Sequence, residues 1–135
     1  MDSVTLEMAG AHVALVTIQR PEARNAVNGA VATGLDRIVK HIEKDSNIWV
    51  AVLTGAGGAA FCAGADLKEV SAGRMDDLYT PDGAFAGFVK HPRDKLWIAA
   101  VEGFALAFMH GNRPCQTHRK LRERSGRFRD DLGVG

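Results

Sequence analysis

The residues best suited to chemistry lie in one short segment, residues 63–68 (AGADLK). The small residues 63–65 leave the backbone open to close approach by another molecule. Asp66, with Glu69 three residues later, resembles a capping box and predicts a short helix that begins near Leu67. The N–H groups at such a point favour a nearby anion, and a thioester carbonyl that becomes an enolate would be stabilised there. The alternative is a tight turn whose small residues only permit packing.

A glycine-rich loop, residues 55–60 (GAGGAA), formally fits the G-x-G-x-x-A fingerprint of dinucleotide-binding folds. Asp76 and Asp77 lie roughly 20 residues further on, where that fingerprint places its acidic residue. The fingerprint needs a helix that opens directly from the loop, however, and Gly64 interrupts the residues that would form it. A phosphate-binding P-loop is excluded because no Gly-Lys-Ser/Thr follows. We therefore interpret residues 55–60 as a flexible loop.

The other reactive residue types show no spacing that predicts a metal site or a nucleophilic relay. The five histidines are His12, His41, His91, His110 and His118. Cys62 and Cys115 lie far apart and outside any C-x-x-C context, so we expect neither a disulfide framework nor a zinc site. A reducing, cytoplasmic location is the corresponding expectation.

Charge and hydropathy argue against two classes of partner. The 17 Lys and Arg residues nearly balance 16 Asp and Glu residues, and no basic patch with interleaved aromatic residues predicts nucleic-acid binding. No apolar run approaches the ~18–20 residues that span a bilayer. The first ten residues lack the basic cluster of a secretory signal. We expect neither nucleic acid nor membrane as a partner.

Strands and one long helix must position the segment at residues 63–68. Residues 12–18 are rich in β-branched side chains and predict a strand, and residues 97–101 predict another. Residues 48–54 are apolar nearly throughout, which is typical of a strand buried on both faces.

A helix is predicted between the first two strands. Residues 25–42 repeat apolar side chains at helical spacing, and either Asn25 or Asn28 would cap the helix start. Residues 71–92 are mixed and predict a mobile helical or loop segment. Strand, helix and buried strand in this order predict an α/β layer architecture.

Residues 111–135 differ in kind from the rest of the chain. They hold seven of the 17 basic residues but three of the 16 acidic ones. Their isolated apolar side chains follow neither strand nor helix periodicity, and they are too few to offset the entropy of ordering the segment. We expect a disordered tail, and its abrupt start is typical of translation in a shifted reading frame.

Three blocks of sequence occur in order along the chain. They are residues 16–27 (VTIQRPEARNAV), residues 52–68 with VLTG and FCAGADLK at their ends, and residues 98–105 (IAAVEGFA). They resemble, in turn, the N-R-P-x-x-x-N-A, V-L-T-G…F-x-A-G-x-D-[LI] and I-A-A-V-x-G-x-A signatures of the enoyl-CoA hydratase/isomerase (crotonase) family. The resemblance covers about residues 4–107.

This resemblance implies an α/β fold of the ClpP/crotonase-like type, a truncated spiral of ββα units. Residues 1–107 would form the CoA-binding N-terminal part of such a domain, and residues 108–135 the basic tail. The implied ligand is an acyl-CoA thioester, with coenzyme A entering as part of the substrate and with no separate cofactor or metal. Intact family members usually form homotrimers or hexamers.

The family holds the thioester carbonyl in an oxyanion hole of two backbone N–H groups, and the first donor falls on Ala65. Arg24 could meet a CoA phosphate, although the alternative is a solvated surface arginine. The residues implied along the CoA path are Ala23, Arg24, Ala63, Gly64, Ala65, Asp66, Leu67 and Lys68.

The chain departs from the family pattern after the third block, where the family continues G-G-G-x-E. Counting on without a gap places Phe108 at the second oxyanion position and Gly111 at that of the glutamate. The family's second glutamate falls near Asp131, whose neighbours do not support the match. The family reaction is hydration of a 2-enoyl-CoA in fatty-acid metabolism, and we expect little or no turnover by this chain. The alternatives are a non-catalytic acyl-CoA-binding subunit and a non-functional pseudogene product.

Overall fold

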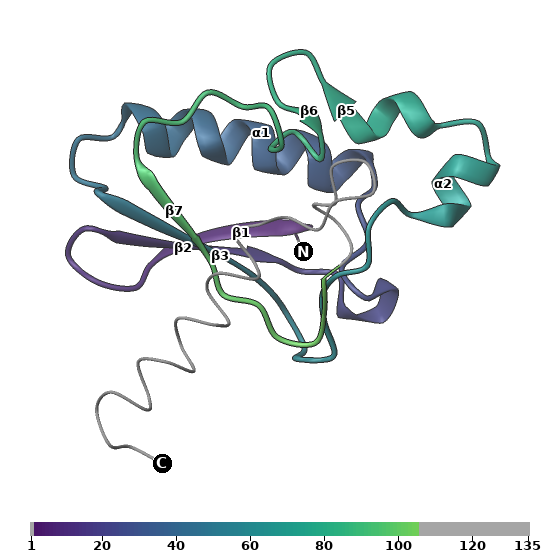
Figure 1. The fold of residues 1–135 in the computed structure, drawn as a ribbon, viewed down its shortest axis with the longest axis horizontal. Coiled ribbons are helices and arrows are strands. Elements are labelled where there is room, and N and C mark those ends of the chain that lie inside the picture. Colours follow the sequence, from purple (N-terminus) through teal and green to yellow (C-terminus); the bar gives the residue numbers. More distant parts are fainter. Residues whose placement is uncertain (1, 106–135) are drawn as a thin grey trace.

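A computed structural model describes residues 2–105 of the chain. These residues form a sheet with one long helix across it (Figure 1). The elements in chain order are β1 (Val4–Met8), β2 (Val13–Ile18), the 3₁₀ helix η1 (Pro21–Ala23), α1 (Gly29–Lys44), β3 (Val50–Gly55), β4 (Ala60–Cys62), α2 (Leu67–Ser71), the 3₁₀ helix η2 (Met75–Leu78), β5 (Tyr79–Thr80), β6 (Ala84–Phe85), β7 (Leu96–Ala99) and β8 (Phe104–Ala105). The predicted α/β architecture is confirmed.

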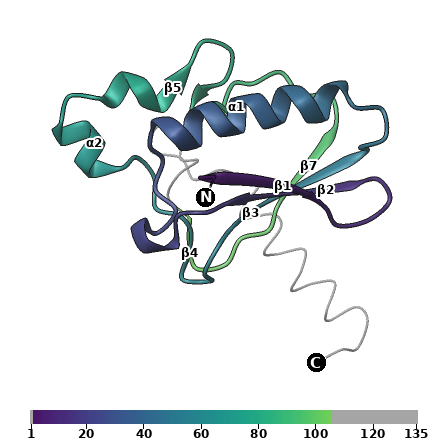
Figure 2. The ribbon, with the colours of Figure 1, turned by 180° about the vertical axis from the view of Figure 1, so that it is seen from behind.

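The main sheet has the strand order β1-β2-β3-β7. β1 and β2 form an antiparallel hairpin, whereas β2, β3 and β7 run parallel to one another. Parallel neighbours need a crossover, and α1 provides it between β2 and β3. Figure 2, from the opposite side, shows α1 lying across the sheet with the β1–β2 hairpin at its edge. No helix of residues 2–105 has the length and apolar composition needed to cross a membrane.

α1 begins at Gly29, which is the later of the two starts that the sequence allows. Asn28 caps it, because the Asn28 side chain accepts a hydrogen bond from the Val31 N–H at 2.9 Å. Asn25 has a left-handed backbone with φ of 56° and therefore cannot start the helix. Of the two asparagines considered, Asn28 is the cap.

The core lies between α1 and one face of the sheet. The buried side chains of this layer include Val16, Ile18, Val31, Leu35, Ile42, Ala51 and Leu53. On the opposite face of β3, Val50 and Val52 are half-buried. The prediction that residues 48–54 are buried on both faces is therefore wrong within the described part of the chain, because α1 covers one face.

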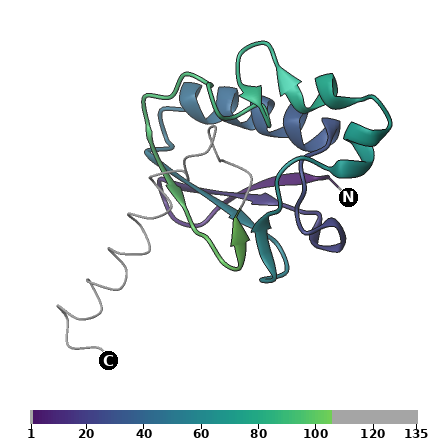
Figure 3. The ribbon, with the colours of Figure 1, turned by 45° about the vertical axis from the view of Figure 1, so that its right-hand side comes forward.

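Residues 71–92 form more regular structure than the mixed pattern predicts. They contain the end of α2, η2 and the small hairpin of β5 and β6, which packs beside α1. Leu78 is fully buried, and the Thr80 hydroxyl donates to Asp36 of α1 at 3.0 Å. A second short pair, β4 and β8, runs parallel below the main sheet (Figure 3).

Candidate functional site

The fold brings together two segments that are some 40 residues apart in the sequence, residues 24–27 and 63–66. Val27 and Ala65 form a parallel bridge. The Val27 N–H donates to the Gly64 carbonyl at 2.8 Å, and the Asp66 N–H donates to the Val27 carbonyl at 2.9 Å. The Ala63 N–H donates to the Arg24 carbonyl at 3.0 Å. The residues predicted to flank CoA come from two sequence blocks. The fold therefore places these residues side by side, along one shared edge of the structure.

Asn25 holds the first of these segments in place. Its side chain is fully buried, accepts from the Arg20 N–H at 2.9 Å and donates to the carbonyls of Ala56 and Ala60 at 2.9 and 2.8 Å. All three bonds reach main-chain groups, so one amide fixes the turn after β2 against the glycine-rich turn. Gly55 permits this approach, because a Cβ there would lie 2.7 Å from the Asn25 Nδ2 atom.

The backbone N–H of Ala65 makes no hydrogen bond to any residue between 2 and 105. The backbone groups on either side of it are already hydrogen-bonded, because the Gly64 carbonyl and the Asp66 N–H both pair with Val27. Gly64 has a φ of 98°, a left-handed conformation that glycine adopts without steric cost. Ala65 itself is half-buried. The predicted oxyanion donor is therefore the N–H of a half-buried residue, and it has no acceptor within the described chain.

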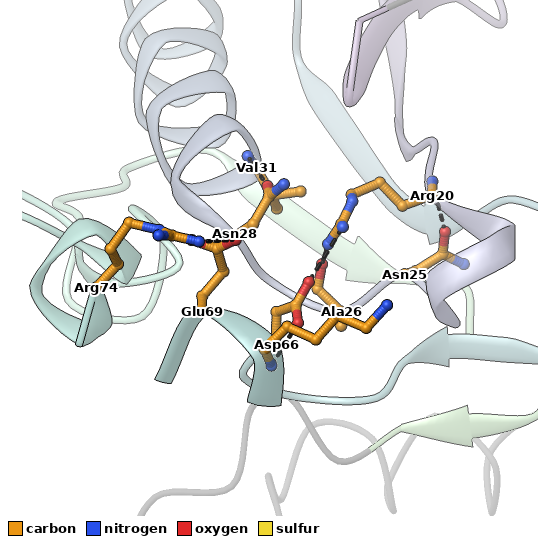
Figure 4. A network of polar contacts seen from close by, with 9 residues as sticks. Arg20, Asn25, Ala26, Asn28, Val31, Asp66, Glu69 and Arg74 are labelled. Atoms are coloured by element: carbon orange, nitrogen blue, oxygen red, sulfur yellow. Dashed lines mark hydrogen bonds and ion pairs between the residues drawn. The ribbon is translucent and has the colours of Figure 1, made fainter. Parts of the chain in front are cut away.

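Asp66, the residue after Ala65, forms an ion pair with Arg20 (Figure 4). The Asp66 side chain caps α2 by accepting from the Lys68 N–H at 3.0 Å, and its other oxygen lies 3.1 Å from the Arg20 Nη2 atom. Burial opposes ionisation of Asp66, but the Arg20 guanidinium and the Lys68 N–H hold its pKa below the usual range. No pattern near Arg20 predicts this pairing, which is visible only in the fold.

The predicted start of α2 near Leu67 is confirmed, whereas the predicted capping box is half wrong. Asp66 supplies its part, but Glu69 does not reach back to the Asp66 N–H. Glu69 instead pairs with Arg74, with Nε–Oε2 and Nη2–Oε1 distances of 2.6 and 3.1 Å (Figure 4). The Arg74 hydrogen bonds lower the pKa of Glu69.

The other residues predicted along the CoA path differ in exposure. Ala23 and Ala63 are half-buried, and the side chains of Arg24, Leu67 and Lys68 are exposed, with Leu67 at 76%. This edge thus combines exposed cations with backbone that small residues leave accessible. Such an arrangement suits a ligand that is anionic at one end and slender along its length.

Cys62, which precedes this segment, is not a nucleophile in this environment. Its side chain is fully buried, and burial raises the pKa of the thiol to about 11, although the Gly64 N–H and Arg20 act in the opposite direction. The thiol is therefore protonated near neutral pH. No group of three or more His, Cys, Asp or Glu side chains within residues 2–105 is arranged to hold a metal.

The glycine-rich turn is followed by β4 and not by a helix. A dinucleotide-binding fingerprint requires the helix, so the geometry of residues 55–62 does not fit that class. The turn instead positions β4 beside β8, where Cys62 is the register partner of Ala105. Ala105 thus lies beside Cys62, the residue that precedes the segment 63–66.

The predicted second oxyanion position, Phe108, lies outside the described residues. Gly111, Asp131 and the whole predicted tail of residues 108–135 lie outside them as well. The assignments made to these positions stay predictions.

Comparison with known proteins identifies a family and several relatives that match most of this chain. A family model described as Enoyl-CoA hydratase/isomerase matches residues 8–108. Short-chain-enoyl-CoA hydratase of Clostridium acetobutylicum is 39% identical over 113 residues, which cover 78% of this chain and 41% of that enzyme. (E)-benzylidenesuccinyl-CoA hydratase of Thauera aromatica is 40% identical over 108 residues, covering 76% of this chain and 40% of that enzyme.

A solved structure agrees with these sequence relatives. Enoyl-CoA hydratase from Mycobacterium tuberculosis H37Rv matches with a TM-score of 0.72 and 41% identity, over 80% of this chain and 41% of that one. The chain therefore spans about two-fifths of the length of these relatives. The three sequence blocks and the observed fold converge on one conclusion: this chain belongs to the enoyl-CoA hydratase/isomerase (crotonase) family and corresponds to the N-terminal region of its relatives.

Proposed function

We propose that this chain binds an acyl-CoA thioester with the thioester carbonyl oxygen on the Ala65 N–H. The observation that carries the proposal is that this N–H group, on the half-buried residue after Gly64, has no acceptor in the described chain. Membership of a family named for enoyl-CoA chemistry supports the choice of ligand. A donor of this kind stabilises the carbonyl more strongly as negative charge develops on it.

The rest of the ligand would follow the shared edge of residues 23–24 and 63–68. Exposed Arg24 and Lys68 supply positive charge for the CoA phosphates, and the small residues 63–65 leave room for the narrow pantetheine arm. Asp66 contributes through its main chain and as the helix cap, because Arg20 and the Lys68 N–H occupy its carboxylate.

The reaction of the family would be addition of water to a 2-enoyl-CoA, which requires carboxylates that position water and transfer a proton. Asp66 is unsuited to this task, because Arg20 and the Lys68 N–H occupy its carboxylate oxygens and lower its pKa, which makes it a weak base. The position that counts as the family's first glutamate is Gly111. We therefore propose acyl-CoA binding with little or no hydration.

The test combines calorimetric binding with an absorbance assay on the whole 135-residue chain. Butyryl-CoA should bind saturably, and crotonyl-CoA should lose its conjugated double bond at least about 10³-fold more slowly than with an intact hydratase, as expected when general acid–base catalysis is missing. A hydration rate close to that of the intact enzyme would contradict low turnover. A folded chain that binds no butyryl-CoA would contradict the proposed binding of an acyl-CoA thioester.

A further inference from the structure

Arg20 contacts both segments that frame the candidate donor. Its Nη1 atom donates to the Ala26 carbonyl at 2.6 Å, and its Nη2 atom donates to the Asp66 carboxylate at 3.1 Å (Figure 4). The side chains of Arg20 and Asp66 are only 17% and 12% exposed, so water screens this pair weakly. One guanidinium thus joins the turn after β2 to the start of α2.

The main chain of Arg20 is fixed as firmly as its side chain. Its N–H donates to the Asn25 side chain, and its carbonyl accepts from the N–H groups of Ala23 and Asn25 at 3.0 and 2.8 Å. Arg20 therefore cannot shift without moving the whole turn. The planar, two-pronged guanidinium transmits this fixed position to Asp66.

The Ala65 N–H lies in the planar peptide group that contains the Gly64 carbonyl, which accepts from the Val27 N–H, and Asp66 fixes the other end of the Ala65 backbone. Asp66 donates its N–H to Val27, and its two carboxylate oxygens accept from the Lys68 N–H and from Arg20, while its carbonyl accepts from the Val70 N–H at 3.1 Å. The bond to Val27 already joins the two segments through their backbones, whereas the Arg20 bond ties the Asp66 side chain to the start of the turn after β2. An oxyanion donor works only within a narrow range of distances, ~2.7–3.1 Å from the oxygen.

We propose that Arg20 is a positioning residue that, through Asp66, aims the Ala65 N–H at the thioester carbonyl and so confers preference for a thioester ligand. This inference rests on the proposed acyl-CoA binding. Arg20 does not contact the ligand itself. Loss of Arg20 should therefore weaken recognition of the carbonyl, while recognition of the rest of CoA remains.

Two matched ligands isolate the carbonyl contact. Butyryl-CoA and S-butyl-CoA, a thioether, have the same chain length and differ in the carbonyl oxygen. The ratio of their dissociation constants, measured by calorimetry, reports that contact alone. For the unmodified chain we expect butyryl-CoA to bind several-fold more tightly, the range that one hydrogen bond of about 0.5–1.5 kcal/mol provides.

In Arg20→Gln this ratio should fall close to one, with the affinity for S-butyl-CoA within about twofold of the unmodified chain. Arg20→Lys should lose most of the preference, because an ammonium cannot bond Ala26 and Asp66 as a fork. Arg74→Gln is the matched control: it breaks the Glu69–Arg74 pair on the far side of α2. That variant should keep the full ratio.

Should Arg20→Gln fail to fold, as judged by thermal unfolding, Asp66→Asn answers the same question, because asparagine retains the helix cap and loses the ion pair. If the ratio in the folded variant is unchanged, or if the affinity for both ligands falls equally, the positioning role is overturned. Failure of the unmodified chain to bind either ligand instead overturns the proposed function, and the inference falls with it.

Discussion

At the scale of single residues, the site depends on side chains that bond to main-chain groups. The small residues 63–65 and the cap at Asp66 were predictable, because their types act locally through the backbone. Asn25 and Arg20 were not assigned these roles, because their partners lie up to 46 residues away and no spacing rule connects them. The sequence presented Asn25 as a potential helix cap, and only the fold shows its three bonds.

Replacing Asn25 by alanine should destabilise the chain strongly. The change removes three hydrogen bonds from a fully buried site and leaves alanine with a φ of 56°. Unsatisfied buried groups cost about 1–3 kcal/mol, and the left-handed backbone adds about 1 kcal/mol or more. Urea unfolding should show a loss of about 3 kcal/mol. The control Asn28→Ala removes a helix cap and should cost about 1 kcal/mol; equal losses would contradict the role of Asn25.

At the scale of elements, β2, β3, β7 and α1 were predictable from their apolar patterns, whereas β1 and the short strand pairs were not predicted. β4, β5, β6 and β8 have two or three residues each, too few to show alternation. They form because the glycine-rich turn and η2 place them beside partners. Their pairing is a product of tertiary context, which overrides local propensity.

Glu43 of α1 connects that helix to β7 and makes this contact sensitive to acid. Its carboxylate accepts from the Trp97 indole N–H at 3.0 Å and from the N–H groups of Asp94 and Lys95 at 3.0 and 3.3 Å. Burial opposes ionisation, but these donors lower the pKa of Glu43. The pKa of Asp36 on the same helix is also lowered, with burial opposing and with Lys40 and Thr80 as the stabilising partners.

A lowered pKa in the folded state contributes stability that is present above the unfolded pKa, about 4 for a carboxyl group. That stability is lost as the pH falls through the folded pKa. The free energy of unfolding should therefore stay level from pH 7 to about 5 and decrease steadily below about 4. Glu43→Gln should flatten this decrease, whereas Glu7→Gln, at an exposed position of β1, should not. Equal acid sensitivity of both variants would disprove the role of Glu43.

At the scale of the whole molecule, the described chain is one helix-covered sheet with an incompletely covered second face. The chain covers about 40% of its relatives' length, and within residues 2–105 the face opposite α1 bears half-buried valines and an exposed Leu96. Family and fold class were predictable because three motifs occur in order. Which face of the sheet is covered was not, because an apolar strand pattern does not specify what packs against it.

A single core between α1 and the sheet predicts unequal costs for two leucines. Leu35 is fully buried and Leu96 is 61% exposed. Leu35→Ala should lower the free energy of unfolding by about 2–5 kcal/mol, and Leu96→Ala by no more than about 0.5 kcal/mol. Urea unfolding with a common m-value makes the comparison. A cost at Leu96 equal to that at Leu35 would show that the open face of the sheet is buried in solution.

The most direct test of the central claim is a nuclear magnetic resonance titration of the ¹⁵N-labelled chain with butyryl-CoA, following the amide of Ala65. We expect its resonance to move saturably downfield, as an N–H does when it gains a carbonyl acceptor, and to move less with S-butyl-CoA. The Glu7 amide on β1 serves as the internal control and should remain in place. A folded chain whose Ala65 resonance is unchanged at saturating butyryl-CoA would contradict thioester binding at this N–H.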